Sequence, residues 1–196
     1  MERTRAALLD AAITLFSERG IYLTRVEDIT ERADVAKGSF YNYFDSKDVL
    51  VAEILTEAIR VLDERFLKIL PGHGDVAYRV AELVSSHQEF VDAFPEYALV
   101  LHQARGLLQL RAGASDRLQR AVQDYLGCLA RYLPLPVDAD LGPGQRLQLA
   151  TLLAGLVAGP RSFALAADVP YDQALTRDVA CRGLVAILVE AERQVP

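Results

Sequence analysis

Apolar residues recur at helical spacing along almost the whole chain. Near the N-terminus, Leu9, Ile13 and Phe16 repeat with the period of an α-helix, and Gly20 stands where that helix is expected to end. The same period predicts further helices over about 26–33, 37–43, 48–70, 76–93, 96–110, 116–133, 144–167 and 171–193. No segment alternates with the two-residue period of a strand. The pattern therefore predicts an all-α protein.

The predicted helices fall into two groups that meet near residue 47. The first three are short and closely joined, and the later ones are longer and more apolar. We therefore expect a small N-terminal module over residues 1–47 and a larger domain over 48–196, with the boundary at the start of a helix that belongs to both. A module of this size is small for independent stability, so we expect it to pack against the larger part.

Two short helices in this module have the lengths and the turn of a helix-turn-helix. Thr24 is followed three residues later by Glu27, the spacing of a capping box, which predicts the start of the second helix. Asp34 lies in the turn before the third helix, at a position that requires a residue tolerant of positive φ.

The third predicted helix has one apolar face and one face of small residues. On a helical wheel the apolar arc holds Ala36, Phe40, Tyr43 and Phe44. The opposite side holds Gly38, Ser39 and Asn42, with Lys37 and Tyr41 at its flanks. Small residues allow close approach to another surface, and an ammonium and a phenol can contact phosphates, as a helix in the major groove of DNA requires. A short amphipathic helix with a solvated face would show the same pattern, so this segment alone leaves both alternatives open.

The position of Lys47 favours DNA binding. It lies in the first turn of the next predicted helix, where a cation opposes the helix dipole. Its presence is explained if that helix end binds an anion, with backbone N–H groups and the ammonium meeting one phosphate.

Residues 9–50 resemble the DNA-binding module of TetR-family transcriptional regulators. The match comprises A-A-x-x-L-F-x-x-x-G, then T-x-V-x-x-I, then A-x-V-x-K-G-S-x-Y-x-Y-F-x-S-K-x-x-L. The resemblance implies an all-α homodimer in which three helices bind an operator, and a larger helical domain binds a small ligand and dimerises. The residues expected at the DNA surface are Thr24, Arg25, Lys37, Gly38, Ser39, Tyr41, Asn42, Tyr43 and Lys47. Arg25, Asp34 and Ala36 depart from the family pattern, which more often has a small hydroxyl residue, glycine and serine at these positions.

The charge balance weakens this interpretation without removing it. Residues 1–50 contain seven Lys or Arg and nine Asp or Glu, a net charge of 7 − 9 = −2, and the whole chain carries −6. This excludes a surface that binds polyanions all round. Arg25, Lys37 and Lys47 nevertheless cluster at predicted helix N-termini. We expect few phosphate contacts and a shallow dependence of DNA affinity on salt.

The last two long helices are candidates for a dimer interface. Residues 175–189 are apolar nearly all round the helix, which suits a helix buried on every side. Residues 150–159 carry Ala154, Gly155, Ala158 and Gly159, whose spacing permits close helix contact. A tight crossing within one chain is the alternative. The family resemblance implies a homodimer through about 144–167 and 171–193, and a near-palindromic operator.

Polar residues between the apolar runs of the middle helices suggest a ligand pocket. An aromatic pocket with one or two buried bases would suit an amphipathic acid or an acyl thioester. The candidates are Phe90, Tyr97, His102, Arg105 and Arg161. The alternative is that His87, His102 and Arg105 are surface residues or satisfied core residues. His87 and His102 have no paired ligand at helical spacing, so we expect no metal site.

The remaining signals narrow the class of protein. The chain opens on a charged segment rather than a signal peptide, its longest uncharged apolar run covers only 147–160, and Cys128 and Cys181 have no metal-binding spacing. We expect a cytoplasmic protein that is not an enzyme and carries no cofactor, because no nucleophile motif, phosphate loop or clustered acid pair is present. The sequence predicts a ligand-responsive repressor released from its operator by a small apolar or acyl-type effector. An activator of the same fold stays open. The alternative class is a helical small-molecule-binding protein or enzyme whose tri-helical N-terminus does not bind DNA.

Overall fold

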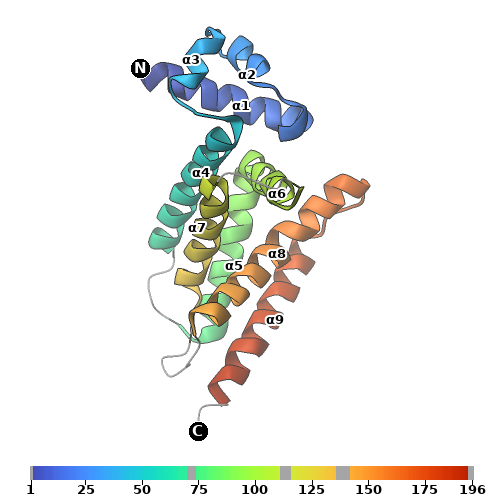
Figure 1. The fold of residues 1–196 in the computed structure, drawn as a ribbon. Helices are drawn as coiled ribbons and strands as arrows, with labels where there is room; N and C mark the ends of the chain where they lie inside the picture. The colour runs from blue at the N-terminus through green and yellow to red at the C-terminus, as the bar shows by residue number, and fades with distance from the viewer. Residues whose placement is uncertain (1, 70–73, 111–115, 136–141, 194–196) are drawn as a thin grey trace. The chain divides into compact units, whose positions relative to one another are not determined.

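Helices make up all of the regular structure in the computed structural model, which describes residues 2–69, 74–110, 116–135 and 142–193. In these residues they are α1 (Glu2–Leu23), α2 (Val26–Arg32), α3 (Lys37–Tyr41), α4 (Lys47–Ile69), α5 (Val76–Ala93), α6 (Pro95–Leu110), α7 (Asp116–Tyr132), α8 (Pro143–Ala167) and α9 (Gln173–Arg193) (Figure 1). The all-α fold is confirmed. The predicted bounds are close to those observed, except that α3 ends two residues early, at Tyr41, and α9 begins two residues late, at Gln173.

α1 breaks at Gly20, where the periodic pattern predicts its end. Gly20 has φ 85° and ψ 159°, a conformation open essentially only to glycine, and the chain then makes one more short turn to Leu23. The break removes the intrahelical partner of the Ile21 N–H group, which instead donates to Gln103 Oε1 of α6 at 2.6 Å. Gln103 Nε2 also donates to Phe16 O at 3.5 Å. One side chain of α6 therefore satisfies the backbone on both sides of the break.

The first of two compact units consists of Met1–Ala58 and Phe94–Asp124. Its core contains apolar side chains from the beginning of the chain and from α6 and α7, which come much later in the sequence. The first group includes Leu8, Phe16, Ile29, Phe40, Phe44 and Leu50, and the second includes Val100, Ala104 and Leu118. α6 packs directly on α1. Each buried Leu or Phe contributes roughly 1.5–3 kcal/mol, so α6 and the start of α7 supply the apolar surface that the N-terminal helices lack.

The second unit consists of Ile59–Ala93 and Tyr125–Pro196. Within it α5 packs on α8 and α9, which also pack on each other (Figure 1). Gln88 Nε2 of α5 donates to Tyr171 Oη and to Gln173 O, both at 3.0 Å, and so ties α5 to the start of α9. Asp63 Oδ1 of α4 accepts from Arg131 Nη1 at 2.9 Å and from Tyr132 Oη at 3.0 Å in α7. Polar ties between helices thus accompany the apolar packing.

The boundary predicted at residue 47 lies inside the first compact unit, at the first residue of α4. α4 continues through both units. The predicted division into 1–47 and 48–196 is a division by function and does not follow the packing of the two units. As a functional division it stays a prediction.

Among the described residues, no helix combines the length and the apolar character needed to cross a membrane.

Replacing Gly20 tests whether the break in α1 needs glycine. Gly20→Ala should lower the free energy of unfolding by about 1–3 kcal/mol, because an L-residue is strained at this φ and ψ. The added Cβ would lie 3.5 Å from Gln103 Oε1, an ordinary contact, so the cost comes from the backbone. Gly106→Ala in α6 of the same unit is the control. Its Cβ meets nothing within 4 Å, and alanine should stabilise the helix by about 0.5–1 kcal/mol. Urea unfolding gives both values, and a Gly20→Ala protein as stable as the wild type would contradict the assignment.

Candidate functional site

The turn between α2 and α3 is closed by backbone hydrogen bonds. The Asp34 N–H donates to Glu31 O at 3.1 Å, and the Val35 N–H donates to Thr30 O at 3.0 Å. Asp34 has φ 54°, so the expectation of positive φ here is confirmed. Ala36 follows with extended backbone and precedes the first residue of α3. These bonds fix the direction in which α3 leaves the turn.

α3 buries its aromatic side and exposes its small side. Phe40 and Phe44 are at most 1% exposed, with ring centroids 5.5 Å apart. The opposite surface is formed by exposed Lys37, Gly38, Tyr41 and Asn42, with half-buried Ser39 beside them, whereas half-buried Tyr43 packs against the core. A Cβ added to Gly38 would meet nothing within 4 Å, so this surface is open to a partner. The two faces predicted from the helical wheel are confirmed, but the placement of Ala36 on the core face is wrong. Ala36 is exposed because it precedes the helix and has an extended backbone.

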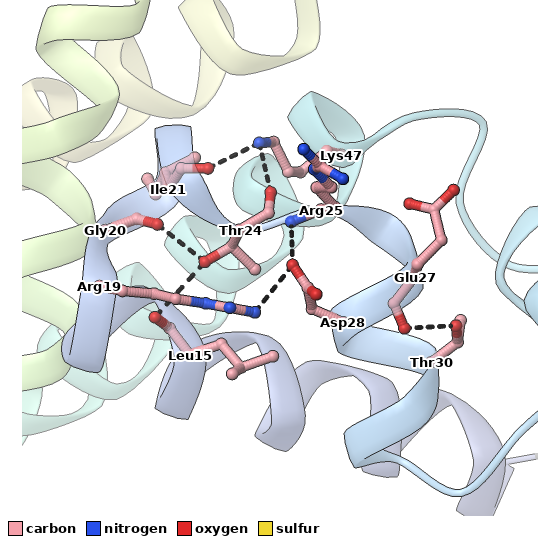
Figure 2. A network of polar contacts seen from close by, with 10 residues as sticks. All are labelled: Leu15, Arg19, Gly20, Ile21, Thr24, Arg25, Glu27, Asp28, Thr30 and Lys47. Carbon is pink, nitrogen blue, oxygen red and sulfur yellow. Dashed lines mark hydrogen bonds and ion pairs between the residues drawn. The ribbon is translucent and has the colours of Figure 1, made fainter.

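Thr24 is fully buried, and its hydroxyl contacts the end of α1 (Figure 2). Thr24 Oγ1 donates to Gly20 O at 2.8 Å and lies 3.4 Å from Leu15 O. The prediction that Thr24 and Glu27 form a capping box is wrong. α2 begins at Val26, as predicted, but its N-cap is Arg25 rather than Thr24, and the Arg25 N–H donates to Asp28 Oδ2 at 2.7 Å. A carboxylate three residues after the N-cap can accept this N–H bond whatever the side chain of the N-cap residue is. The spacing of Arg25 and Asp28 in the sequence was therefore also compatible with a helix start. Thr24 therefore supports the surface from inside, and its hydroxyl is not exposed.

Lys47 binds backbone oxygens rather than standing free at the start of α4. Its Nζ donates to Ile21 O at 2.6 Å and to Thr24 O at 2.7 Å (Figure 2). These carbonyls lie at the C-terminal end of α1 and just beyond it, where a cation is favourable to the helix dipole. Lys47 thus ties α4 to the connection between α1 and α2. The phosphate contact expected at this residue stays a prediction.

Other cations near α3 form exposed ion pairs within the protein. Lys37 Nζ pairs with Glu27 Oε1 of α2, and Arg19 Nη2 pairs with Asp28 Oδ2 at 2.8 Å. The Lys37 ammonium, by its hydrogen bond, lowers the pKa of Glu27, and the Glu27 carboxylate raises the pKa of Lys37. Water screens an exposed pair of this kind, so another anion can replace the carboxylate at low cost. The sequence did not predict the pairing of Lys37 with Glu27, because the two residues lie on different helices.

The expected ligand-binding residues are divided between the two units. His102 and Arg105 lie on α6 in the first unit, and both side chains are exposed. Neither is the buried base that the sequence suggests, because each points away from the face of α6 that packs on α1. Tyr97 is half-buried in the same unit, with its ring 5.8 Å from that of Phe94. As ligand contacts these residues stay a prediction.

Phe90 and Arg161 belong to the second unit. Phe90 is buried in α5. Arg161 Nη1 of α8 forms an ion pair with Asp92 Oδ1 of α5, and Gln173 Nε2 donates to Asp92 Oδ2 at 2.5 Å. The guanidinium therefore already has an anionic partner inside the protein. It joins α8 to α5, and its contact with a ligand stays a prediction.

The sequence-based candidate set omits His87, the histidine that the structure buries most completely. His87 has no exposed surface, and its Nε2 lies 2.7 Å from Tyr125 Oη of α7. Burial lowers the pKa of His87 from 6.5 to about 4, so the ring is neutral near pH 7. The available signal was the run Ser86-His87-Gln88 within a helix that is otherwise apolar on its buried side. Three consecutive polar residues span most of the circumference of a helix, so at least one had to face the interior.

Comparison with known proteins agrees with the geometry of the N-terminal helices. Residues 8–54 match the model of the bacterial regulatory proteins of the tetR family. Residues 8–54 thus form an N-terminal module of the TetR-family type. The matched range covers α2, α3, the turn between them and the start of α4, so the segment that carries the candidate surface is also the one that defines the family.

A curated relative matches less than half of the chain. The HTH-type transcriptional repressor KstR2 of Rhodococcus jostii is 39% identical over 89 residues, which cover 45% of this chain and 44% of the relative. The chain thus spans less than half the length of this curated relative in the match.

Solved structures extend the likeness to the whole fold. FadR of Bacillus subtilis in complex with stearoyl-CoA is 20% identical, with a TM-score of 0.72, covering 92% of this chain and 97% of that one. A putative TetR-family regulator from a Rhodococcus species has the same TM-score and 20% identity, covering 96% and 100%. At this identity the likeness concerns the fold of the chain and not its ligand.

The buried imidazole of His87 makes the stability of the folded chain depend on pH. The unfolded ring takes up a proton below about pH 6.5, whereas the folded ring does so only near pH 4. Between these values the unfolded state binds more protons, so stability falls as the pH falls, by up to about 3 kcal/mol from this ring. His87→Phe should remove that share of the loss, and His102→Phe, which changes an exposed ring, should keep the wild-type slope. Urea unfolding between pH 7 and pH 4 measures the three slopes. Equal slopes for His87→Phe and the wild type would refute the assignment.

Proposed function

We propose that the protein is a DNA-binding transcriptional regulator that places α3 in the major groove of its operator. The observation that carries this is the open surface of α3, where small residues stand between Lys37 and Tyr41 and two buried phenylalanines hold the helix from behind. Small side chains permit close approach to base edges, and the flanking cation and phenol suit phosphates. The match of residues 8–54 to the family model supports the same function.

The regulator acts as a repressor that a small apolar or acyl-type effector releases from DNA. KstR2 of Rhodococcus jostii is named a transcriptional repressor, and the FadR structure with the same fold holds stearoyl-CoA. Both facts belong to those proteins and serve here as support. To release DNA, an effector must bind the DNA-incompetent state more tightly, since equal affinity for both states shifts nothing.

The operator-binding form is a homodimer through α8 and α9. These helices expose apolar side chains, namely Leu147, Leu152, Phe163, Leu175, Val179 and Ile187. A Cβ added to Gly155 or Gly159 in α8 would meet nothing within 4 Å, so no contact within the described chain explains the small residues there. A second copy packed on this surface would bury both features. Two-fold symmetry then predicts a near-palindromic operator.

Substitutions on α3 test the DNA-binding surface. A preferred duplex is first selected from random DNA with the wild-type protein. Tyr41→Ala should then weaken binding to every duplex, by roughly tenfold, because phosphate contacts position without specifying sequence. Asn42→Ala should instead change the preference between duplex variants. Lys47→Ala should lower both DNA affinity and the free energy of unfolding, because the ammonium also ties α4 to two backbone carbonyls.

Tyr78→Ala is the matched control for this experiment. Tyr78 is 56% exposed in α5, close to the 52% of Tyr41, and lies in the other unit. Its loss should leave the electrophoretic mobility shift unchanged. A wild-type protein that selects no duplex, or a Tyr41→Ala protein that binds like the wild type, would show that α3 is not the DNA-binding surface and would favour a helical small-molecule-binding protein.

A bulky residue at Gly155 tests the dimer. The wild-type protein should have twice the mass of one 21.6 kDa chain by light scattering at micromolar concentration. Gly155→Leu should overpack the interface and reduce dimerisation and DNA binding together. Gly106→Leu, a helical glycine of the first unit that is equally free of contacts, should stay dimeric. A wild-type mass near that of one chain would rule the interface out.

A further inference from the structure

The interior of the second unit contains a polar run that its own helices do not fully pair. Ser86, His87 and Gln88 follow one another in α5, and each is at most 2% exposed. Gln88 is paired with the start of α9, and His87 Nε2 is paired with Tyr125 Oη. In the described part of the chain, His87 Nδ1 and Ser86 Oγ have no hydrogen-bond partner.

Two unpaired polar atoms on neighbouring residues need a physical explanation. A buried donor or acceptor without a partner loses its hydration and gains nothing in return, so such atoms are rare in folded proteins. Phenylalanine and alanine at these positions would avoid the loss. The polar atoms are therefore suited to a group that is present only when a ligand is bound.

The charges around this run restrict what that group can be. Among the described residues of the second unit, Ser86, His87 and Gln88 are the buried polar side chains, and no Lys, Arg, Asp or Glu is buried with them. The guanidinium groups of Arg65 and Arg161, which join α5 to α4 and to α8, form ion pairs with Glu89 and Asp92, and Arg65 Nε is a third buried atom without a hydrogen-bond partner. The buried imidazole is neutral near pH 7. Both cations already have a carboxylate partner, so an ionised ligand group placed here would have to compete with Glu89 or Asp92 for an opposite charge to replace its hydration.

We infer that His87 Nδ1 and Ser86 Oγ bind an uncharged hydroxyl or carbonyl group of a largely apolar ligand inside the second unit. The inference rests on the proposed function only in making this ligand the effector. The chemistry of a neutral imidazole allows both groups. If the Tyr125 hydroxyl donates to Nε2, then Nδ1 carries the proton and donates to a carbonyl or hydroxyl oxygen; in the other tautomer Nδ1 accepts from a hydroxyl. This site differs from the anchor expected at His102 and Arg105, which would select a charged group.

Three probes of equal chain length separate these chemistries: decanol, methyl octyl ketone and decanoate. Each is titrated into the full-length protein without DNA, at pH 7, with affinity measured by calorimetry. The ring nitrogen shifts of the three histidines are followed by NMR. Decanol and the ketone should bind about tenfold more tightly than decanoate. They should shift the nitrogen signals of His87 and leave those of His102 in place.

Two variants test the two atoms separately. His87→Phe keeps a ring at this position and removes both nitrogens, and it should lower the affinity for decanol and the ketone about tenfold. Ser86→Ala removes one oxygen with little change in volume and should lower the same affinities by a smaller factor. It also provides the test if His87→Phe fails to fold. His102→Phe tests the alternative anchor at His102, and it should leave the affinities for decanol and the ketone unchanged.

Four outcomes would overturn the inference. They are tighter binding of decanoate than of the uncharged probes, a loss of affinity in His102→Phe rather than in His87→Phe, no response of the His87 nitrogens to any probe, and unchanged affinities in Ser86→Ala together with His87→Phe. The last would assign the two atoms to internal water. Because no DNA is present, the result is independent of the proposed regulator. If the protein binds decanol through His87 but selects no duplex, the ligand site is supported and the DNA-binding function is refuted. If it selects a duplex but does not bind decanol through His87, the DNA-binding function is supported and the ligand site is refuted.

Discussion

The burial of Phe40 and Phe44 is the contact on which the candidate DNA surface depends. α3 has only five residues, and a helix this short is not stable in water without tertiary packing. Its two rings are at most 1% exposed, and each contributes roughly 1.5–3 kcal/mol to folding. Once Phe40 points inward, helical geometry sends Gly38 and Asn42 outward. The surface available to DNA is therefore a consequence of what the same helix buries.

That burial in turn requires residues far from the N-terminal module. Val100 and Ala104 of α6 lie in the same core as Phe40, and Gln103 satisfies the backbone at the break after Gly20. The three N-terminal helices are too small to enclose a core of this size by themselves. The packing of the segment that matches the family model, residues 8–54, is thus completed by residues 94–124. A change in α6 can alter the N-terminal helices without touching the surface of α3.

The two candidate sites obey opposite electrostatic conditions. At α3 the cations are exposed and paired, and exchange of the Glu27 carboxylate for a phosphate costs little because water screens both pairs. In the interior beside His87 there is no screening, so an unpaired charge is excluded and an unpaired hydrogen-bonding atom is costly. The outer site therefore suits a polyanion, which salt can displace, and the inner one suits a neutral, mainly apolar molecule.

The sequence by itself determined the features that follow from local periodicity. These are the helices and their approximate bounds, the buried and exposed faces of α3, the break at Gly20 and the positive φ of Asp34. Only the tertiary structure decided which polar groups meet. Lys47 reaches the carbonyl of Ile21, which lies 26 residues earlier, and Thr24 turns inward although its spacing to Glu27 fits a helix start. His87 is buried although Ser86 and Gln88 flank it, and His102 is exposed although Val100 and Leu101 precede it. A helical pattern says which residues share a face, but which face is covered depends on helices that are distant in sequence.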